Sequence, residues 1–329
     1  MKRLVVRTTV AVSLSCFLAT AYGQRPPAAL PGGYPAKSVR MLVGSSPGGG
    51  VDTISRGVAQ KLSEHWGQSF VVENRTGGGV LAVTLLAQAA PDGYTLYGGG
   101  SQVVTATPLK KVPFDTRVVL TPVVQLTTSS YFLLVHPSLP LKSVKELVAL
   151  AKRRPGTLNY GSAGTGSASH LGGELFKFRT GADLMHIPYK GNGQALIDLI
   201  SGQTQMMFTS TISGSPRVKS GKARGIAVTS LKRLPAYPDV PTVSESGVGG
   251  FELDNMYGLY APAGLPQPIL LALNREVSQI MNSPEVKSRV AADGAEVAPP
   301  NSPAEFRNRF APEIEMREKF IKTSGIKVD

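Results

Sequence analysis

The chain has 329 residues, of which 42% are hydrophobic and 17% are charged, a balance that excludes a disordered or a highly charged protein. At roughly 100–200 residues per domain, this length predicts two domains. Lys and Arg outnumber Asp and Glu by 35 to 22, which gives a net charge of +13. Such an excess occurs in nucleic-acid-binding proteins, but here the basic residues are scattered, and their densest clusters lie at expected helix ends, where they complement the helix dipole. The charge therefore indicates a soluble basic surface and no nucleic-acid partner.

The first 23 residues have the order of a secretory signal peptide: basic residues, an apolar run that ends near Ala19, and then small residues. The run is too short to span a bilayer, which needs about 20 apolar residues; an uncleaved anchor is the alternative. The one cysteine, Cys16, lies in this run without the pattern that precedes a lipidated cysteine. We therefore expect a signal peptide at residues 1–23, a flexible tail at 24–33, and a periplasmic mature chain with no thiol.

From residue 39 onward, short apolar runs typical of strands alternate with apolar residues at helical spacing. Expected strands cover residues 39–43, 70–72, 94–97, 132–135, 158–160, 185–187, 205–208, 225–228 and 256–261. Expected helices cover residues 51–66, 80–90, 144–152, 168–179, 194–199, 216–219, 268–281, 284–292 and 303–323. This alternation predicts sheets flanked by helices, in a first lobe of residues 34–130 with 254–329 and a second lobe of residues 131–253. A cleft between two such lobes is where small ligands bind.

The motifs of common enzymes are missing from the sequence. It has no GxxxxGK[ST], HExxH or GxSxG pattern, and the glycines at 164 and 166 lack the third glycine of a dinucleotide fingerprint. The four histidines have no metal-ligand spacing. We therefore predict a protein that is not an enzyme and that uses no cofactor or metal. A secreted hydrolase is the alternative, since distant carboxylates can meet in a fold.

Two strand–loop–helix corners, at residues 44–52 and 161–170, place glycines and small hydroxyl residues just ahead of a helix. A helix N-terminus offers unpaired backbone N–H groups and the positive end of the helix dipole, and glycine lets an anion approach closely. Capping alone explains either corner equally well. Two corners in matching positions favour a carboxylate that is held from both lobes.

Segments along the chain resemble the Bug family, the substrate-binding proteins of tripartite tricarboxylate transporters. The resemblance lies in SPGGGVD (46–52), VVENR (71–75), APDGYTL (90–96), HPSLP (136–140), PGTLNY (155–160), IPYKG (187–191), DVPT (239–242) and YGLYAP (257–262). It covers essentially the whole mature chain, in order. It implies a periplasmic binding protein of the type II-like α/β fold, with a mainly parallel sheet in each lobe. Such a protein, a monomer, closes on a carboxylate and presents it to membrane transporter subunits; a receptor, in a sensor role, is the alternative.

Carried over by position, the resemblance also implies the ligand contacts. These are Ser46, Gly49 and Asp52 in the first lobe; Ser162, Thr165, Gly166, Ser167 and His170 in the second; and Ser101 and Tyr189, each after a strand. A helix-start cap is favoured over a ligand contact for Asp52, and capping or packing is an equal alternative for His170.

The chain departs from the family pattern at Thr209 and Ser210, where many relatives carry Asp and then Asn. An acid at that position can pair with a ligand ammonium or hydroxyl group, whereas Thr209 offers only a hydroxyl. We therefore expect a carboxylate without an ammonium group to be preferred over α-amino acids. A second departure, the small residues at 44–46, predicts a wider cleft.

Overall fold

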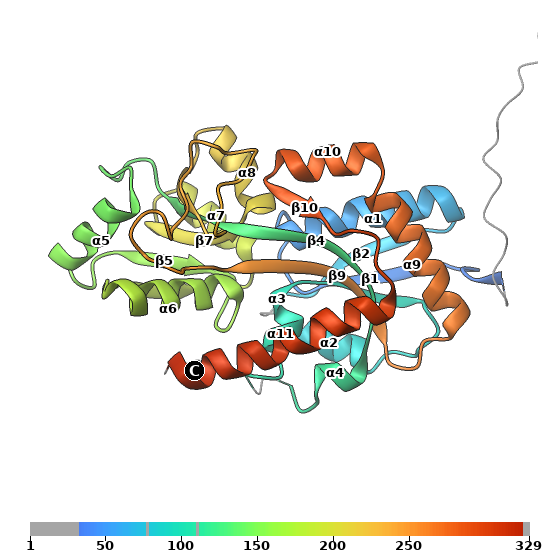
Figure 1. Cartoon of the computed structure of the whole chain (residues 1–329). Helices are drawn as coiled ribbons and strands as arrows, with labels where there is room; N and C mark the ends of the chain where they lie inside the picture. The colour runs from blue at the N-terminus through green and yellow to red at the C-terminus, as the bar shows by residue number, and fades with distance from the viewer. Residues whose placement is uncertain (1–32, 77–78, 110–111, 325–329) are drawn as a thin grey trace, which may run out of the picture.

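The computed structural model describes residues 33–76, 79–109 and 112–324, and shows two α/β lobes side by side (Figure 1). The predicted signal peptide, Cys16 and nearly all of the predicted tail lie outside the described residues. Two strands, β4 (Leu120–Val135) and β9 (Asp254–Pro262), run through the middle of the molecule. The architecture is the predicted two-lobe α/β fold.

The sheet of lobe 1 has the strand order β2-β1-β3-β9-β4, with β10 also paired to β4. Its other strands are β1 (Val39–Val43), β2 (Phe70–Asn74), β3 (Thr95–Gly99) and β10 (Ala295–Val297). Strands β2, β1 and β3 are parallel, whereas β9 and β10 pair in antiparallel fashion. Strand β1 is an apolar run because helices cover both of its faces.

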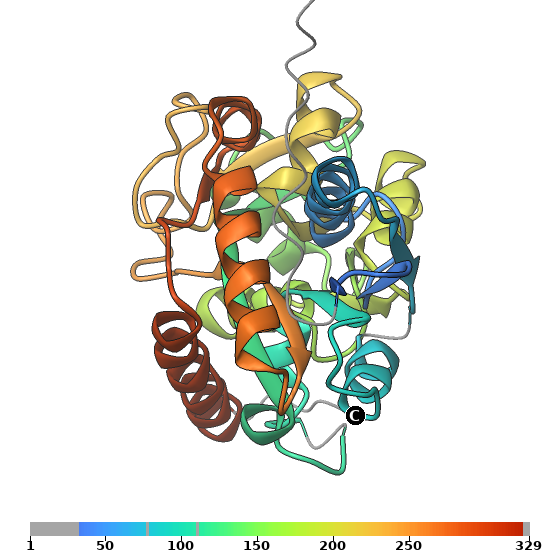
Figure 2. The same ribbon diagram turned by 90° about the vertical axis from the view of Figure 1, so that its right-hand side faces the viewer.

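The helices of lobe 1 surround this sheet, and Figure 2 shows α9 (orange) between α1 (blue) and α11 (dark red). They are α1 (Gly50–Trp66), α2 (Val80–Ala87), α3 (Ser101–Thr105), α4 (Thr116–Val119), α9 (Gln267–Met281), α10 (Pro284–Ala292) and α11 (Pro303–Ser324). The predicted apolar face of α1 is confirmed, since Val51, Val58 and Leu62 are buried. The C-terminal helices α9 and α11 pack against β4 of this sheet.

Lobe 2 continues the sheet from the second half of β4 in the order β4-β7-β5-β6, with β8 also paired to β4. Its elements are α5 (Val144–Arg153), β5 (Asn159–Ser162), α6 (Ala168–Thr180), β6 (Met185–Pro188), α7 (Asn192–Ile200), β7 (Met206–Ser210), α8 (Thr211–Lys219) and β8 (Arg224–Val228). Strands β5, β6 and β7 are parallel, and β4 pairs with β7 and β8 in antiparallel fashion.

Strand β4 is the main feature that the sequence pattern did not predict. The expected strand covered only residues 132–135, because Pro122 and the Thr- and Ser-rich residues 127–130 resemble a loop. The proline lies at an irregularity in the pairing of β4 with β9, where a missing N–H is tolerated. Strand β4 pairs with β9 as far as Ser130 and with β7 from Tyr131 onward. Antiparallel pairing around β4 and β9 therefore makes both sheets more mixed than the expected mainly parallel arrangement.

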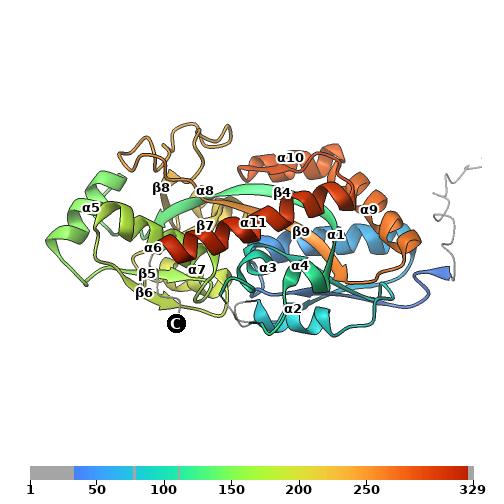
Figure 3. The same cartoon turned by 60° about the horizontal axis from the view of Figure 1, so that its bottom comes forward.

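Helix α8 is longer than predicted, and helix α11 runs past both lobes. Helix α8 begins at Thr211 rather than at Pro216, because Ser210 accepts a hydrogen bond from the backbone N–H of Ser213 and caps it. Helix α11 runs from lobe 1 along the crossing strands toward α6 (Figure 3). Within the described ranges, we find no helix with both the length and the apolar character needed to cross a membrane.

Candidate functional site

The first predicted corner connects β1 to α1 and leaves the start of α1 without a side-chain cap. Gly49 is the N-cap residue and makes no side-chain hydrogen bond to the helix. Backbone N–H groups at such a terminus have no intrahelical partner and, together with the helix dipole, attract anions. The Asp52 carboxylate accepts a hydrogen bond from Gly48 N at 3.0 Å and others from Arg56 and Asn74. Asp52 therefore holds the loop in the manner of a helix-start cap.

Ser46 connects the two lobes. Its Oγ accepts a hydrogen bond from the backbone N–H of Gly193, at 3.1 Å, in the first turn of α7. A Cβ on Gly191 would lie 2.5 Å from the same oxygen. The lobes meet so closely here that they leave room only for glycine, so the structure represents a closed arrangement.

The second predicted corner connects β5 to α6 and is held by its own side chains. Ser167 is the N-cap residue of α6 and accepts a hydrogen bond from His170 N at 3.3 Å. Ser169 Oγ accepts one from Ala163 N at 2.9 Å and lies 2.9 Å from Ser167 Oγ. Gly166 N donates to His170 Nδ1 at 3.0 Å. These bonds fix the loop so that the start of α6 faces lobe 1.

A partly buried stack of two histidine rings supports this second loop from behind. The imidazole rings of His170 and His186 stack with their centroids 4.0 Å apart. Ser162 Oγ lies 2.6 Å from His186 Nε2 and accepts a hydrogen bond from Gly164 N. Burial, assisted by the neighbouring His170, lowers the pKa of His186 to about 4. His186 is therefore neutral near pH 7 and acts as a support for the loop.

The two corners face each other across a cavity of about 20 Å³, room for about one water molecule. Its lining comes from both lobes: Ser45, Gly49, Gly50, Val51, Gln102, Tyr131, Ala163, Ser167, Ala168, Ser169, Asn192, Asn255 and Tyr257. Among the residues that the structure describes, those lining this cavity are all uncharged. The starts of α1, α6 and α7 all contribute to the wall. This arrangement favours an anion over a cation, because the helix starts direct N–H groups and positive dipole ends toward the cavity, and Asp52, the acidic residue in the first turn of α1, is paired with Arg56.

Several polar groups of the wall have no hydrogen-bond partner within the described parts of the chain. These are Ser45 Oγ, Asn192 Oδ1 and Asn255 Oδ1. Ser45 and Asn255 are each only 4% exposed. Buried polar groups are almost always paired in native proteins, because an unpaired group costs about 1–3 kcal/mol. Their presence together in one small cavity indicates a site for a polar ligand or for ordered water.

Of the predicted contact residues, Gly49 and Ser167 line this cavity. The other predicted residues whose side chains are described lie outside its wall: Ser46, Asp52, Ser162, Thr165, Gly166, His170, Tyr189 and Thr209. Ser101 is the first residue of α3, and its side chain lies outside what the structure describes. The role of all these residues as ligand contacts stays a prediction.

Two of the outlying residues have distinct environments. The Tyr189 hydroxyl donates a hydrogen bond to Asp198 Oδ2 at 2.7 Å, and burial together with this carboxylate raises the pKa of Tyr189 to about 12. Thr209 is fully buried in β7, and its Oγ1 lacks a hydrogen-bond partner among the described residues. Tyr189 is thus occupied within lobe 2, whereas Thr209 keeps a free hydroxyl near the crossing strands.

Sequence reasoning missed much of the wall. Ser45, Gly50 and Ser169 lie inside the two predicted corners, so a broader choice within each corner would have included them. Asn255 and Tyr257 come from β9, which returns from lobe 2 and pairs with β4. Nothing local in the sequence marks those residues, because their position depends on strand pairing.

In the described part of the chain, no cluster of His, Cys, Asp and Glu side chains is arranged to hold a metal ion.

Comparison with known proteins identifies the family. Residues 54–326 match the family model described as "Tripartite tricarboxylate transporter family receptor" (TctC). The solved structure of Rpa4515 from R. palustris with adipate is 35% identical, with a TM-score of 0.85 over 89% of this chain and 99% of that one. The periplasmic binding protein BugD is 31% identical, with a TM-score of 0.86 over 89% and 99%. MatC from Rhodopseudomonas palustris, with bound malate, is 32% identical, with a TM-score of 0.83 over 88% and 100%.

These similarities extend over nearly the whole described chain and include both lobes. The proteins of the family that match are periplasmic solute-binding proteins rather than enzymes. The resemblance seen in the sequence is thus confirmed, and the chain belongs to the TctC (Bug) family of tripartite tricarboxylate transporter receptors.

Proposed function

We propose that this protein is an extracytoplasmic solute-binding protein that captures a small carboxylate between its lobes and delivers it to a tripartite tricarboxylate-type membrane transporter. The observation that carries the proposal is the uncharged cavity between the starts of α1 and α6, with its unpaired polar groups. The adipate held by Rpa4515 and the malate held by MatC support the carboxylate class.

The ligand enters by separation of the lobes. A cavity of about 20 Å³ is too small for a dicarboxylate, so the closed arrangement has to open and then close around its ligand. The proposed lobes are residues 34–130 with 254–329 and residues 131–253. The change of pairing partner along β4, between Ser130 and Tyr131, supports this division. Strands β4 and β9 would then carry the hinge.

The ligand carries no ammonium group. The described wall of the cavity contains no Asp or Glu that would pair with one, and Thr209 stands where many relatives have an acid. Burial of an unpaired ammonium group is strongly unfavourable. Dicarboxylates, tricarboxylates and aromatic carboxylates are therefore preferred over α-amino acids.

The site of action is the periplasm. The predicted signal peptide at residues 1–23 and the periplasmic location of BugD support this location. The closed form of the monomer presents the carboxylate to the transporter subunits, because only that form offers both lobes in one fixed arrangement.

The test is a thermal-shift screen of mature protein that has been unfolded, stripped of ligand and refolded. A ligand at 100 times its Kd stabilises the protein by about 2.7 kcal/mol, which raises Tm by a few degrees in a chain of this size. We expect binding between the lobes to produce a shift with one class of carboxylate. The absence of a shift across di-, tri- and aromatic carboxylates, with refolding verified, would contradict carboxylate capture.

Pairs of ligands that differ only in an amino group test whether the site disfavours an ammonium group. Succinate is compared with aspartate, and glutarate with glutamate, because each pair differs only in the amino group. We expect the deaminated member to bind more tightly. Equal or tighter binding of the amino acid would contradict the argument from the uncharged wall.

Delivery is tested separately by uptake of the radiolabelled carboxylate in cells with and without the gene. A transport role predicts that uptake is slower in cells that lack the protein and that re-expression of the protein restores the rate. Unchanged uptake together with a changed transcriptional response would instead favour the sensor role.

A further inference from the structure

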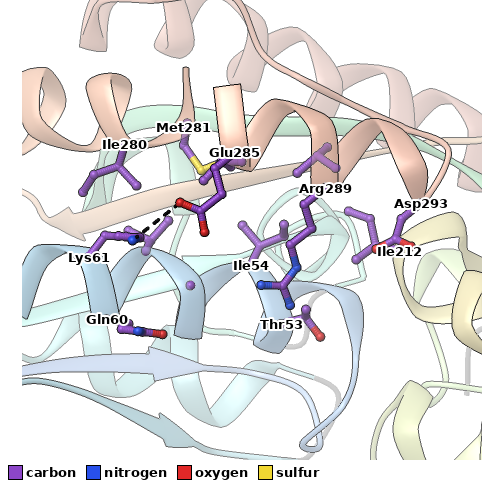
Figure 4. Close-up of a pocket in the computed structure, with 14 residues that line it drawn as sticks. Thr53, Ile54, Gln60, Lys61, Ile212, Ile280, Met281, Glu285, Arg289 and Asp293 are labelled. Atoms are coloured by element: carbon purple, nitrogen blue, oxygen red, sulfur yellow. Dashed lines mark ion pairs between the residues drawn. The ribbon is translucent and has the colours of Figure 1, made fainter. Parts of the chain in front are cut away.

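A second cavity, of about 110 Å³, lies between α1 and the α9–α10 pair, with Ile212 of α8 at its end (Figure 4). None of the described residues that line it also lines the inter-lobe cavity. It is therefore a separate site, and the inference drawn from it does not depend on the proposed function.

The wall of this cavity is mostly apolar. It is formed by Ile54, Val58, Ile212, Ile280, Met281, Val286 and Val290. Five of these side chains are buried in the core, and Ile54 and Val286 pack against it. An apolar cavity of about 150 Å³ is enough to hold benzene in another protein. The present cavity, at about 110 Å³, is smaller, so one aromatic ring would fit only with part of it at the mouth.

The charges at the mouth are paired, with one exception. Lys61 Nζ lies 3.7 Å from a Glu285 carboxylate oxygen, the ion pair drawn in Figure 4. The Asp293 carboxylate lies 3.5 Å from Lys219 Nζ. Arg289 is exposed and, among the residues that the structure describes, forms no hydrogen bond or ion pair, although Glu285 and Asp293 lie one helical turn before and after it. One positive charge is therefore available to an incoming anion.

The guanidinium group of Arg289 is placed to use that charge. Arg289 extends from α10 toward α1, and its guanidinium lies beside Ile54 and Thr53 (Figure 4). The planar fork of an arginine matches the two oxygens of a carboxylate. The hydroxyl of Thr53 donates to Gly49 O at 3.1 Å.

We propose that this cavity binds a small monocarboxylate with an apolar body, of the size of benzoate, with its carboxylate on Arg289 and its ring against the apolar wall. A second carboxylate on the same molecule would have to enter the apolar wall without a partner, which is unfavourable. The ligand class of this site thus differs from the dicarboxylates found in the relatives.

The test is a titration of the mature protein with benzoate, followed by NMR of ¹³C-labelled Ile and Met methyl groups. We expect shifts at Ile54, Ile212, Ile280 and Met281, and none at Ile187 or Ile314, which do not line the cavity. This readout locates the benzoate directly, whether or not another molecule occupies the inter-lobe cavity. Shifts confined to other methyl groups, or no shifts, would overturn the proposal.

Two variants of Gly57 test the cavity itself. Gly57 lines it, and a Cβ at this position would have no heavy atom within 4 Å. Gly57→Leu fills the space and should abolish the benzoate shifts, whereas Gly57→Ala leaves room and should preserve them. Retention of the shifts in folded Gly57→Leu protein would refute binding in this cavity.

Two arginine variants test the carboxylate contact. Arg289→Gln should weaken benzoate binding by about five- to tenfold, as expected for one exposed charge-assisted contact. Arg275→Gln, an exposed arginine on α9 that does not line the cavity, is the matched control and should have no effect. Benzamide, which has no charge, should bind both variants alike. Equal weakening by the two substitutions would contradict the role of Arg289.

Discussion

The substitution Gly193→Ala tests closure of the lobes without affecting the folding of either lobe. Gly193 lies in the first turn of α7 in lobe 2 and is buried against lobe 1. A Cβ at this position would lie 2.5 Å from the Pro47 carbonyl oxygen and 2.9 Å from Ser46 Oγ. The carbonyl oxygen belongs to the backbone, so it cannot rotate away. The substitution Gly193→Ala is therefore compatible with each lobe but not with the closed arrangement.

The expected effect follows from the cost of overpacking. Inserting a methylene-sized group into a packed contact costs roughly 1–3 kcal/mol. Because the three nearest atoms all belong to lobe 1, this cost falls on the closed form and weakens ligand binding by about 5- to 150-fold. In the open form, replacing a helical glycine by alanine is neutral or stabilising by up to about 1 kcal/mol.

The assay is calorimetric titration of Gly193→Ala with the carboxylate selected by the thermal-shift screen. Gly57→Ala serves as the control, because its added methyl group meets no atom within 4 Å. We expect weaker binding by Gly193→Ala alone, with no loss of Tm in the ligand-free protein. Binding within about twofold of the wild type would refute the coupling of ligand capture to this contact.

Three further predictions concern stability. The Asn301 side chain accepts a hydrogen bond from Gln125 N at 2.9 Å and donates one to Gln125 O at 3.2 Å. The substitution Asn301→Ala should therefore lower the unfolding free energy by about 1–3 kcal/mol. A denaturant titration that shows no loss of stability would contradict this prediction. Asp254 is exposed, but partial desolvation by the surrounding protein, together with Glu252 and Glu313, raises its pKa to about 6. Above that pH the carboxylate is charged, and this charge lowers the stability of the folded protein, so Asp254→Asn should raise Tm at pH 8, with a gain that shrinks toward pH 4. A gain that grows on acidification would count against this. The pKa of His186 is lowered from 6.5 to about 4 by burial and by His170, so the folded protein binds fewer protons in that window and loses stability as the pH falls from 6.5 to 4. His186→Gln should flatten this decline, and an unchanged pH profile would exclude His186 as its source.

The alternation of elements was predictable because its signals are local. The apolar residues of α1 recur at helical spacing, and β1 is a short apolar run between turn residues. The two corners were equally visible, since glycines and small hydroxyl residues precede a helix in each of them. Local pattern therefore sufficed for the two-lobe class.

The wall of the site was less predictable because it depends on contacts distant in the chain. Asn255 and Tyr257 reach the cavity only because β9 returns beside β4. Strand β4 itself was obscured by Pro122, whose tolerance depends on an irregularity in the sheet. The contact between Ser162 and His186, 24 residues away in the chain, was likewise not visible in the sequence. Such pairings have no periodic signature.

The most direct test of the account is a crystal structure of the mature protein with the carboxylate selected by the screen. The account predicts a carboxylate oxygen between the lobes, within about 2.7–3.2 Å of backbone N–H groups at the start of α1 or α6. It also predicts that Ser45 or Asn255 gains a hydrogen bond to the ligand or to a water molecule beside it. A carboxylate bound only outside the inter-lobe cavity, with both side chains still unpaired, would contradict the central claim.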